Sequence, residues 1–107
     1  MMYDVKYTKL SEADLTELDS SRQKAIKKAI DKVAKNPLPK NEGGYGEPLG
    51  HKHGKNLTGY CKIKLLKLGI RVVYKIVKED GVMRIIVIAA RADDEVYDIA
   101  AKRIEQG

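Results

Sequence analysis

The chain has 107 residues, of which 43% are hydrophobic, and its formal net charge is +6. This length suits one domain with one modest core, and the hydrophobic share excludes an intrinsically disordered chain. No apolar run approaches the roughly 20 residues of a membrane-spanning helix, and the start lacks the pattern of a secretory signal. We therefore expect a single domain over residues 1–107, located in the cytoplasm and without contact to a membrane.

Cysteine and histidine are scarce. Cys61 is the only cysteine, which excludes an internal disulfide and favours a reducing compartment. One cysteine with His51 and His53 is too few for a structural zinc site, so we expect no metal and no other cofactor. Both histidines fall in a loop and are expected to be solvated rather than catalytic. Cys61 falls on the apolar side of a strand and is expected to be buried.

The positive charge is concentrated in one part of the chain. Residues 51–91 contain ten lysines and arginines against two acids, whereas the rest contains eleven basic and thirteen acidic residues. No acid occurs between residues 59 and 78. This pattern favours a surface that binds a polyanion. A basic cluster without nearby carboxylates is poor for stability but well suited to holding a phosphodiester.

The chain begins with a strand and a short helix. Tyr3, Val5 and Tyr7 alternate with polar residues, which predicts a strand. Ser11 is the expected N-cap of a helix over residues 12–18.

A longer helix follows. Ser20 and Gln23 form a candidate capping box, and apolar residues repeat at helical spacing to about residue 35, with lysines on a solvated face. Asn36-Pro37 ends this helix. Residues 37–56 are rich in glycine and proline and are predicted to be a long loop that is either mobile or functional.

Three strands are predicted at about residues 58–66, 70–78 and 82–90, with turns near Leu68-Gly69 and Asp80-Gly81. Asp93 or Asp94 can cap a final helix. The expected order is strand–helix–helix–strand–strand–strand–helix. This order predicts an α+β fold in which the helical hairpin packs on a mainly antiparallel sheet.

Alternation also places the basic residues. Lys62 and Lys64 share one face of their strand. A two-residue turn at either possible position puts Arg71 on the same face, whereas a bulge or a three-residue loop would not. Arg91 lies at a strand end, beside the helix that carries Tyr97, so four cations and a phenol can converge.

At these residues the chain resembles the RelE group of the RelE/ParE toxin superfamily. The segments that carry the resemblance are GYCKIKL (59–65), GIRVVYKI (69–76) and VIAARADDEVYDIAAKRI (87–104). The resemblance implies a RelE-like fold and a ribosome-dependent endoribonuclease that cuts mRNA in the ribosomal A site without a metal. It also implies a cognate RelB-like antitoxin as partner, in a toxin–antitoxin hetero-oligomer.

The resemblance further implies roles for five residues. Lys62 and Lys64 would bind the phosphate, and one of them would be the general base. Arg71 and Arg91 would stabilise the charge of the transition state, and Arg91 would protonate the leaving 5′ oxygen. Tyr97 would orient a base or assist deprotonation of the 2′ hydroxyl. Neighbouring cations favour a lowered lysine pKa, as such a base requires.

Alternatives stay open at this point. A ParE-like poison of DNA gyrase would share the fold without nuclease activity, and a plain nucleic-acid-binding domain is a third possibility. The lysines are alternatively a solvated strand face, and Tyr97 a core residue. Arg71 is alternatively paired with an acid of the last helix, and Arg91 with Asp93 or Asp94.

Overall fold

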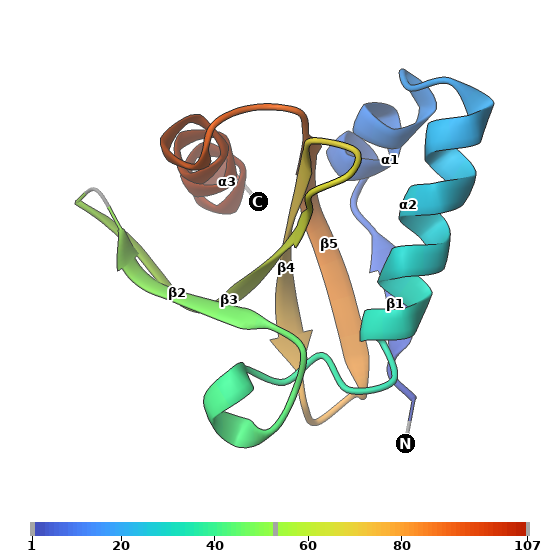
Figure 1. Ribbon diagram of the computed structural model, residues 1–107. Helices are drawn as coiled ribbons and strands as arrows, with labels where there is room; N and C mark the ends of the chain where they lie inside the picture. Colours follow the sequence, from blue (N-terminus) through green and yellow to red (C-terminus); the bar gives the residue numbers. More distant parts are fainter. Residues whose placement is uncertain (1, 53, 107) are drawn as a thin grey trace.

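The computed structural model describes residues 2–52 and 54–106, which form a five-stranded sheet with helices on both faces (Figure 1). The elements in chain order are β1 (Asp4–Tyr7), α1 (Lys9–Thr16), α2 (Ser20–Val33), the short 3-10 helix η1 (Lys40–Glu42), β2 (Glu47–Lys52), β3 (Lys55–Leu65), β4 (Ile70–Val77), β5 (Val82–Ala89) and α3 (Asp93–Gln106). The strand order is β1-β5-β4-β3-β2; β1 runs parallel to β5, and the other pairs are antiparallel. The predicted α+β class is confirmed.

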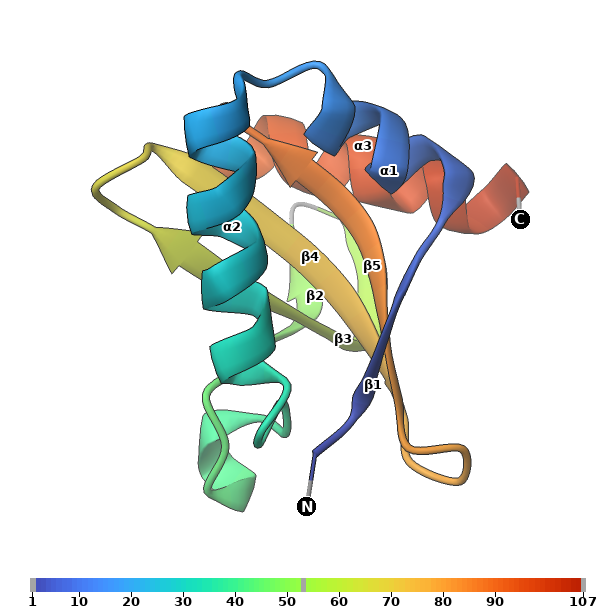
Figure 2. The same cartoon turned by 90° about the vertical axis from the view of Figure 1, so that its right-hand side faces the viewer.

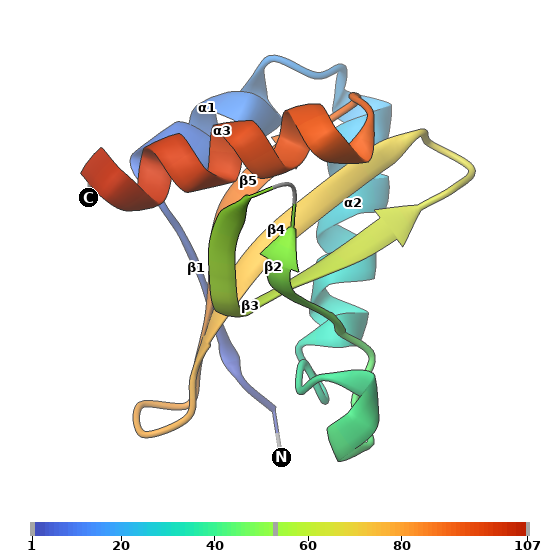
Figure 3. The same cartoon turned by 90° about the vertical axis from the view of Figure 1, so that its left-hand side faces the viewer.

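The helices divide the core into two layers. In Figure 2, α2 lies in front of the sheet, whereas Figure 3 shows α3 crossing the opposite face. Alternation along the strands supplies apolar side chains to both faces. The cluster under α1 and α2 includes Leu15, Ile26, Ile30, Val72, Tyr74 and Ile85. The cluster under α3 includes Leu49, Leu57, Val73, Val87, Val96 and Ala100.

Both predicted helix starts are wrong. α1 begins at Lys9 because Thr8 is its N-cap, with Oγ1 accepting from the Ser11 N–H at 3.1 Å. Ser11 is buried, and its hydroxyl donates back to the Thr8 carbonyl at 3.0 Å. Asp19 occupies the N-cap position of α2 without a side-chain capping hydrogen bond, and the Gln23 amide donates to the Leu18 carbonyl at 2.7 Å. A buried serine is therefore held inside the first turn rather than before it.

The predicted loop over residues 37–56 contains the strand β2, and β3 begins earlier than expected, at Lys55. Pro48 and Gly50 argue against a strand in the interior of a sheet. β2 tolerates them because it is an edge strand, and its register shifts between these two residues. His51 is exposed on β2, as expected, whereas His53 lies outside the described residues.

Tyr74 fixes the start of this segment to the sheet. Its side chain is fully buried, and its hydroxyl donates to the Pro37 carbonyl at 2.7 Å. Burial raises the pKa of this phenol, so the hydroxyl stays a donor. Gly46 lies against the same hydroxyl, where an added Cβ would come within 2.2 Å of the Tyr74 oxygen. The chain between Pro37 and Gly46 is therefore packed rather than free.

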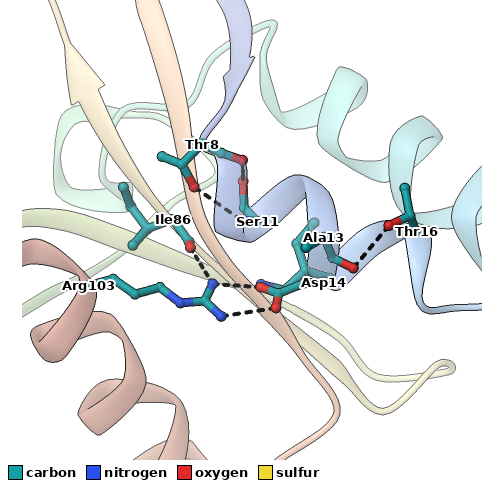
Figure 4. Close-up of polar contacts among 8 residues, drawn as sticks. Thr8, Ser11, Ala13, Asp14, Thr16, Ile86 and Arg103 are labelled. Carbon is teal, nitrogen blue, oxygen red and sulfur yellow. Dashed lines mark hydrogen bonds and ion pairs between the residues drawn. The ribbon is translucent and has the colours of Figure 1, made fainter. Parts of the chain in front are cut away.

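A bulge in β5 is held by two charged side chains from different helices (Figure 4). Val73 pairs with Val87 and Tyr74 with Ile85, which leaves Ile86 as the extra residue. The Arg103 guanidinium donates to the Ile86 carbonyl at 2.8 Å and to both carboxylate oxygens of Asp14 at 2.7 and 3.0 Å.

Asp14 also accepts a hydrogen bond from the Ile88 N–H at 3.0 Å, beyond the last residue that pairs β1 with β5. α1 and α3 are thereby joined at the edge of β5, where backbone groups would otherwise lack partners. Within the described ranges, no helix is long and apolar enough to cross a membrane.

Removing the Tyr74 hydroxyl should destabilise the fold. We expect Tyr74→Phe to lower the free energy of unfolding by about 1–2 kcal/mol, because the Pro37 carbonyl loses its donor in a buried place. Tyr45→Phe is the matched control, since Tyr45 lies half exposed in the same segment; it should change the value by less than about 0.5 kcal/mol. Urea denaturation measures both, and equal losses would contradict this account.

Breaking the Asp14–Arg103 pair should cost more. We expect Asp14→Ala to lower the free energy of unfolding by about 3 kcal/mol, because a largely buried guanidinium and the Ile88 N–H lose their acceptor. The exposed Asp31 of α2 offers the same substitution, Asp31→Ala, as a control for lost charge. Thermal and urea unfolding compare the two variants, and similar stabilities would mean that the Asp14–Arg103 pair does not stabilise the fold.

Candidate functional site

Three of the predicted site residues lie together on adjacent strands. Residues 66–69 form the turn between β3 and β4, closed by hydrogen bonds from the Leu68 N–H to the Leu65 carbonyl at 3.0 Å and from the Gly69 N–H to the Leu66 carbonyl at 3.2 Å. In this register Lys64 is directly opposite Arg71. Lys62 and Lys64 therefore share a face with Arg71, as the parity of the turn predicted.

The carboxylate of Asp93, the first residue of α3, lies at the centre of these cations. Its Oδ2 is 3.1 Å from Lys62 Nζ and 3.3 Å from Lys64 Nζ. Its Oδ1 accepts a hydrogen bond from Nε of Arg71. The expectation of a basic cluster without a nearby carboxylate is therefore wrong, and the alternative in which Arg71 pairs with an acid of the last helix is confirmed. The sequence pointed to Asp93 as a helix cap or a partner of Arg91, and not as the common partner of these three cations.

Tyr97 lies one helical turn further along α3 and contacts the most buried of the cations. Lys62 donates from Nζ to the Tyr97 hydroxyl, and the same nitrogen is 5.0 Å from the centre of the tyrosine ring. Only 4% of the Lys62 side chain is exposed. The ring itself is buried in the cluster under α3, so Tyr97 is a core residue whose hydroxyl reaches the site.

Arg91 is placed differently. Its carbonyl accepts a hydrogen bond from the Arg71 guanidinium at 2.7 Å, but its own guanidinium is exposed and lies 3.3 Å from Glu95. The alternative partners Asp93 and Asp94 are therefore wrong. The structure brings together Lys62, Lys64, Arg71 and Tyr97 around one carboxylate, and it leaves the Arg91 side chain at the rim.

Hydrogen bonds within the site fix the charges of Lys62 and Asp93. Burial favours a lower pKa for Lys62, but hydrogen bonds to Tyr97 and Asp93 outweigh it, and the pKa is raised above its ordinary value. Burial likewise favours a higher pKa for Asp93, yet the hydrogen bonds from Lys62, Arg71 and Lys64 lower it to about 2. The predicted lowering of a lysine pKa is therefore wrong for Lys62. At neutral pH the site holds a lysine cation and an aspartate anion.

A groove with a cavity volume of about 510 Å³ opens beside the two lysines, between β3 and α2. Glu47 lines this groove, and further cations, Lys32 and Lys40, lie at its rim with the half-exposed ring of Tyr45. Composition alone did not select these three residues, because they lie in separate segments. Basic and aromatic side chains along one groove are typical of surfaces that bind single-stranded nucleic acid.

Cys61 supplies no nucleophile to the face that carries Lys62 and Lys64. Cys61 is buried on the opposite side of β3, as expected, and burial raises the pKa of its thiol to about 11, so it is no nucleophile. Across residues 2–52 and 54–106, no group of three or more histidine, cysteine, aspartate or glutamate side chains could hold a metal ion.

The sequence matches a known family of toxins along most of its length. A family model for the ParE toxin of type II toxin–antitoxin systems matches residues 5–95. A protein of Escherichia coli, described as a RelE-like toxin, is 27% identical over 107 residues, which cover 97% of this chain and 99% of that protein.

Solved structures show the same fold along almost the whole chain. A free variant of E. coli toxin RelE with two arginine-to-alanine substitutions is 27% identical with a TM-score of 0.75, covering 97% of this chain and 99% of that one. The same variant in complex with a peptide of the antitoxin RelB is 25% identical with a TM-score of 0.69, covering 96% and 98%. This chain therefore belongs to the RelE/ParE superfamily and is a RelE-like toxin of a toxin–antitoxin system.

Proposed function

We propose that this toxin is a ribosome-dependent endoribonuclease, which acts in the cytoplasm and cleaves mRNA in the ribosomal A site. One observation carries the proposal: Lys62, Lys64 and Arg71 point at the two oxygens of a single carboxylate. A phosphodiester also offers two equivalent oxygens that share one negative charge. Donors arranged for the carboxylate are therefore arranged for a phosphodiester as well.

The reaction that suits this site needs no metal. The 2′ oxygen attacks the adjacent phosphorus, its proton passes to a base, and the bond from phosphorus to the 5′ oxygen breaks. The products are a 2′,3′-cyclic phosphate and a 5′ hydroxyl, which takes up a proton. Negative charge grows on the non-bridging oxygens in the transition state, where Lys62, Lys64 and Arg71 would stabilise it.

Arg91 would assist the leaving oxygen. In the structure its exposed guanidinium is held by Glu95 alone among the described carboxylates, at 3.3 Å. An exposed pair of this kind is worth about 0–1 kcal/mol, so Arg91 can leave Glu95 for a bound substrate at little cost.

The proton acceptor is the weakest part of the machinery. Lys62 stays charged, and Asp93 with a pKa of about 2 is a poor base near neutral pH. Lys64 and the Tyr97 hydroxyl remain as the proposed acceptors. A site without a strong acid–base pair depends on substrate positioning, which supports dependence on the ribosome.

A cognate RelB-like antitoxin is the proposed partner, in a toxin–antitoxin hetero-oligomer. The support is the complex of a related RelE variant with a RelB peptide. The excess of positive charge over residues 51–91 suits an acidic or amphipathic segment of such a partner.

A second candidate is a ParE-like poison of DNA gyrase without nuclease activity. Two observations favour it: the matching family model describes a ParE toxin, and Asp93 already satisfies the cations that a nuclease would turn to its substrate. A gyrase poison would leave ribosome-bound mRNA intact and would inhibit DNA supercoiling.

Primer extension on ribosome-bound mRNA tests the nuclease function. The wild-type toxin should create new 5′ ends, and Arg71→Ala and Arg91→Ala should each lower the cleavage rate by about 10²–10³, because each removes a donor that stabilises transition-state charge. Arg22→Ala is the matched control, since Arg22 is an exposed residue of α2 far along the chain from the site. It should keep the wild-type rate.

Arrest of translation without new 5′ ends would rule out the nuclease. Full cleavage by both arginine variants would instead show that the site is assigned to the wrong residues.

The salt dependence of RNA binding tests the phosphate contacts separately from cleavage. Each contact to a single strand contributes about 0.7 to the slope of log affinity against log salt concentration. Lys64→Ala should therefore lower the slope by about 0.7, whereas Lys27→Ala, on the exposed face of α2, should not. Fluorescence polarisation with a 2′-O-methylated oligonucleotide gives both slopes, and identical slopes would contradict a phosphate contact at Lys64.

A further inference from the structure

The Asp93 carboxylate pairs with all three strand cations, Lys62, Lys64 and Arg71, at the same time. Its Oδ2 forms ion pairs with both lysine ammonium groups, at 3.1 and 3.3 Å, and its Oδ1 forms one with the Arg71 guanidinium. Each cation thus points its donor at the aspartate oxygens instead of at open solvent. A second anion cannot bind between the same donors while the carboxylate remains there.

We propose that Asp93 is an internal competitor for the phosphate site, a tethered anion that a phosphodiester must displace before it can bind. This inference deepens the proposed function, because it concerns the same cations. A carboxylate and a phosphodiester each carry one negative charge on two oxygens, so the exchange conserves both the charge and the number of acceptors at the site. Asp93 therefore neutralises the cations when the site is empty, and the phosphodiester neutralises them when it is bound.

The position of Asp93 allows its side chain to rotate away from the three cations. About one third of its side chain is exposed, and Arg91 and Ala92 before it lie outside any helix or strand. Rotation of this side chain moves the carboxylate into solvent without moving Tyr97, which is anchored one turn away in the core. Lys62 then keeps its hydrogen bond to the Tyr97 hydroxyl and gains the incoming phosphate.

Competition of this kind lowers the apparent affinity by the fraction of molecules in which the site is open. The test compares Asp93→Asn with Asp94→Asn. Both variants lose one negative charge in the first turn of α3, but Asp94 is exposed and the structure describes no ion pair for it. The neighbouring substitution therefore measures the general effect of charge alone.

Inorganic phosphate and a 2′-O-methylated dinucleotide are the probes, with affinities from isothermal titration calorimetry on the whole chain. We expect Asp93→Asn to bind both about tenfold or more tightly than wild type, and Asp94→Asn to stay within about twofold. Equal affinities for the two variants, or weaker binding by Asp93→Asn, would overturn the proposal.

A second measurement keeps the test valid should Asp93→Asn fold poorly. Phosphate titration of the wild-type protein, followed by the ¹³C resonances of its side-chain carboxyl groups, should shift Asp93 in a saturable way and leave Asp94 unchanged. Saturable phosphate binding with an unmoved Asp93 resonance would defeat the displacement model.

Neither measurement uses ribosomes or cleavage. Absence of nuclease activity together with tighter phosphate binding by Asp93→Asn would refute the proposed function and leave the inference standing. Absence of phosphate binding by every variant would refute the inference and the phosphate contacts together.

Discussion

The attraction between the Asp93 carboxylate and three strand cations is the constraint on which the arrangement depends. Lys64 and Arg71 are directly opposite across β3 and β4, where like charges repel. Lys62 is almost completely buried, and an unpaired ammonium there would cost several kcal/mol. One carboxylate removes both problems, so the face that carries Lys62, Lys64 and Arg71 is stable only with α3 in place.

The same helix is held at its other end by a different ion pair. Arg103 reaches Asp14 of α1 and the bulge of β5, while Val96 and Ala100 pack into the core between the two charged contacts. α3 is therefore tied down near both ends, through the anion Asp93 at its start and the cation Arg103 near its end, and each is matched by the opposite charge on another element. The register of this helix along the sheet follows from both.

Features that depend on backbone geometry could be predicted from the sequence. Strand alternation and the parity of one turn placed Lys62, Lys64 and Arg71 on one face, and this held because β3 and β4 pair there without a shift in register. The edge strand β2 escaped prediction because its proline and glycine are unfavourable in a strand interior. Asp93 escaped because its position depends on where α3 crosses the sheet, and no local pattern specifies that crossing.

Competition between neighbouring residues explains why the N-cap of α1 and the partner of Arg91 were predicted wrongly. Thr8 and Ser11 are both residue types that favour the N-cap position. Thr8 takes this position because Ser11 is buried inside the first turn, and not because of a difference in capping preference. Arg91 had three acids within four residues, and the turn of the helix presents Glu95 to it. These choices are made by tertiary packing, which single-residue preferences do not contain.

The parallel pairing of β1 with β5 has a consequence for biosynthesis. Asp4–Tyr7 is synthesised well before its partner Val82–Ile85, and Asp14 waits for a residue 89 positions later. Contacts of such long sequence separation form late. β1 therefore cannot join the sheet until β5 has been synthesised, and the Asp14–Arg103 pair that joins α1 to α3 forms only after that.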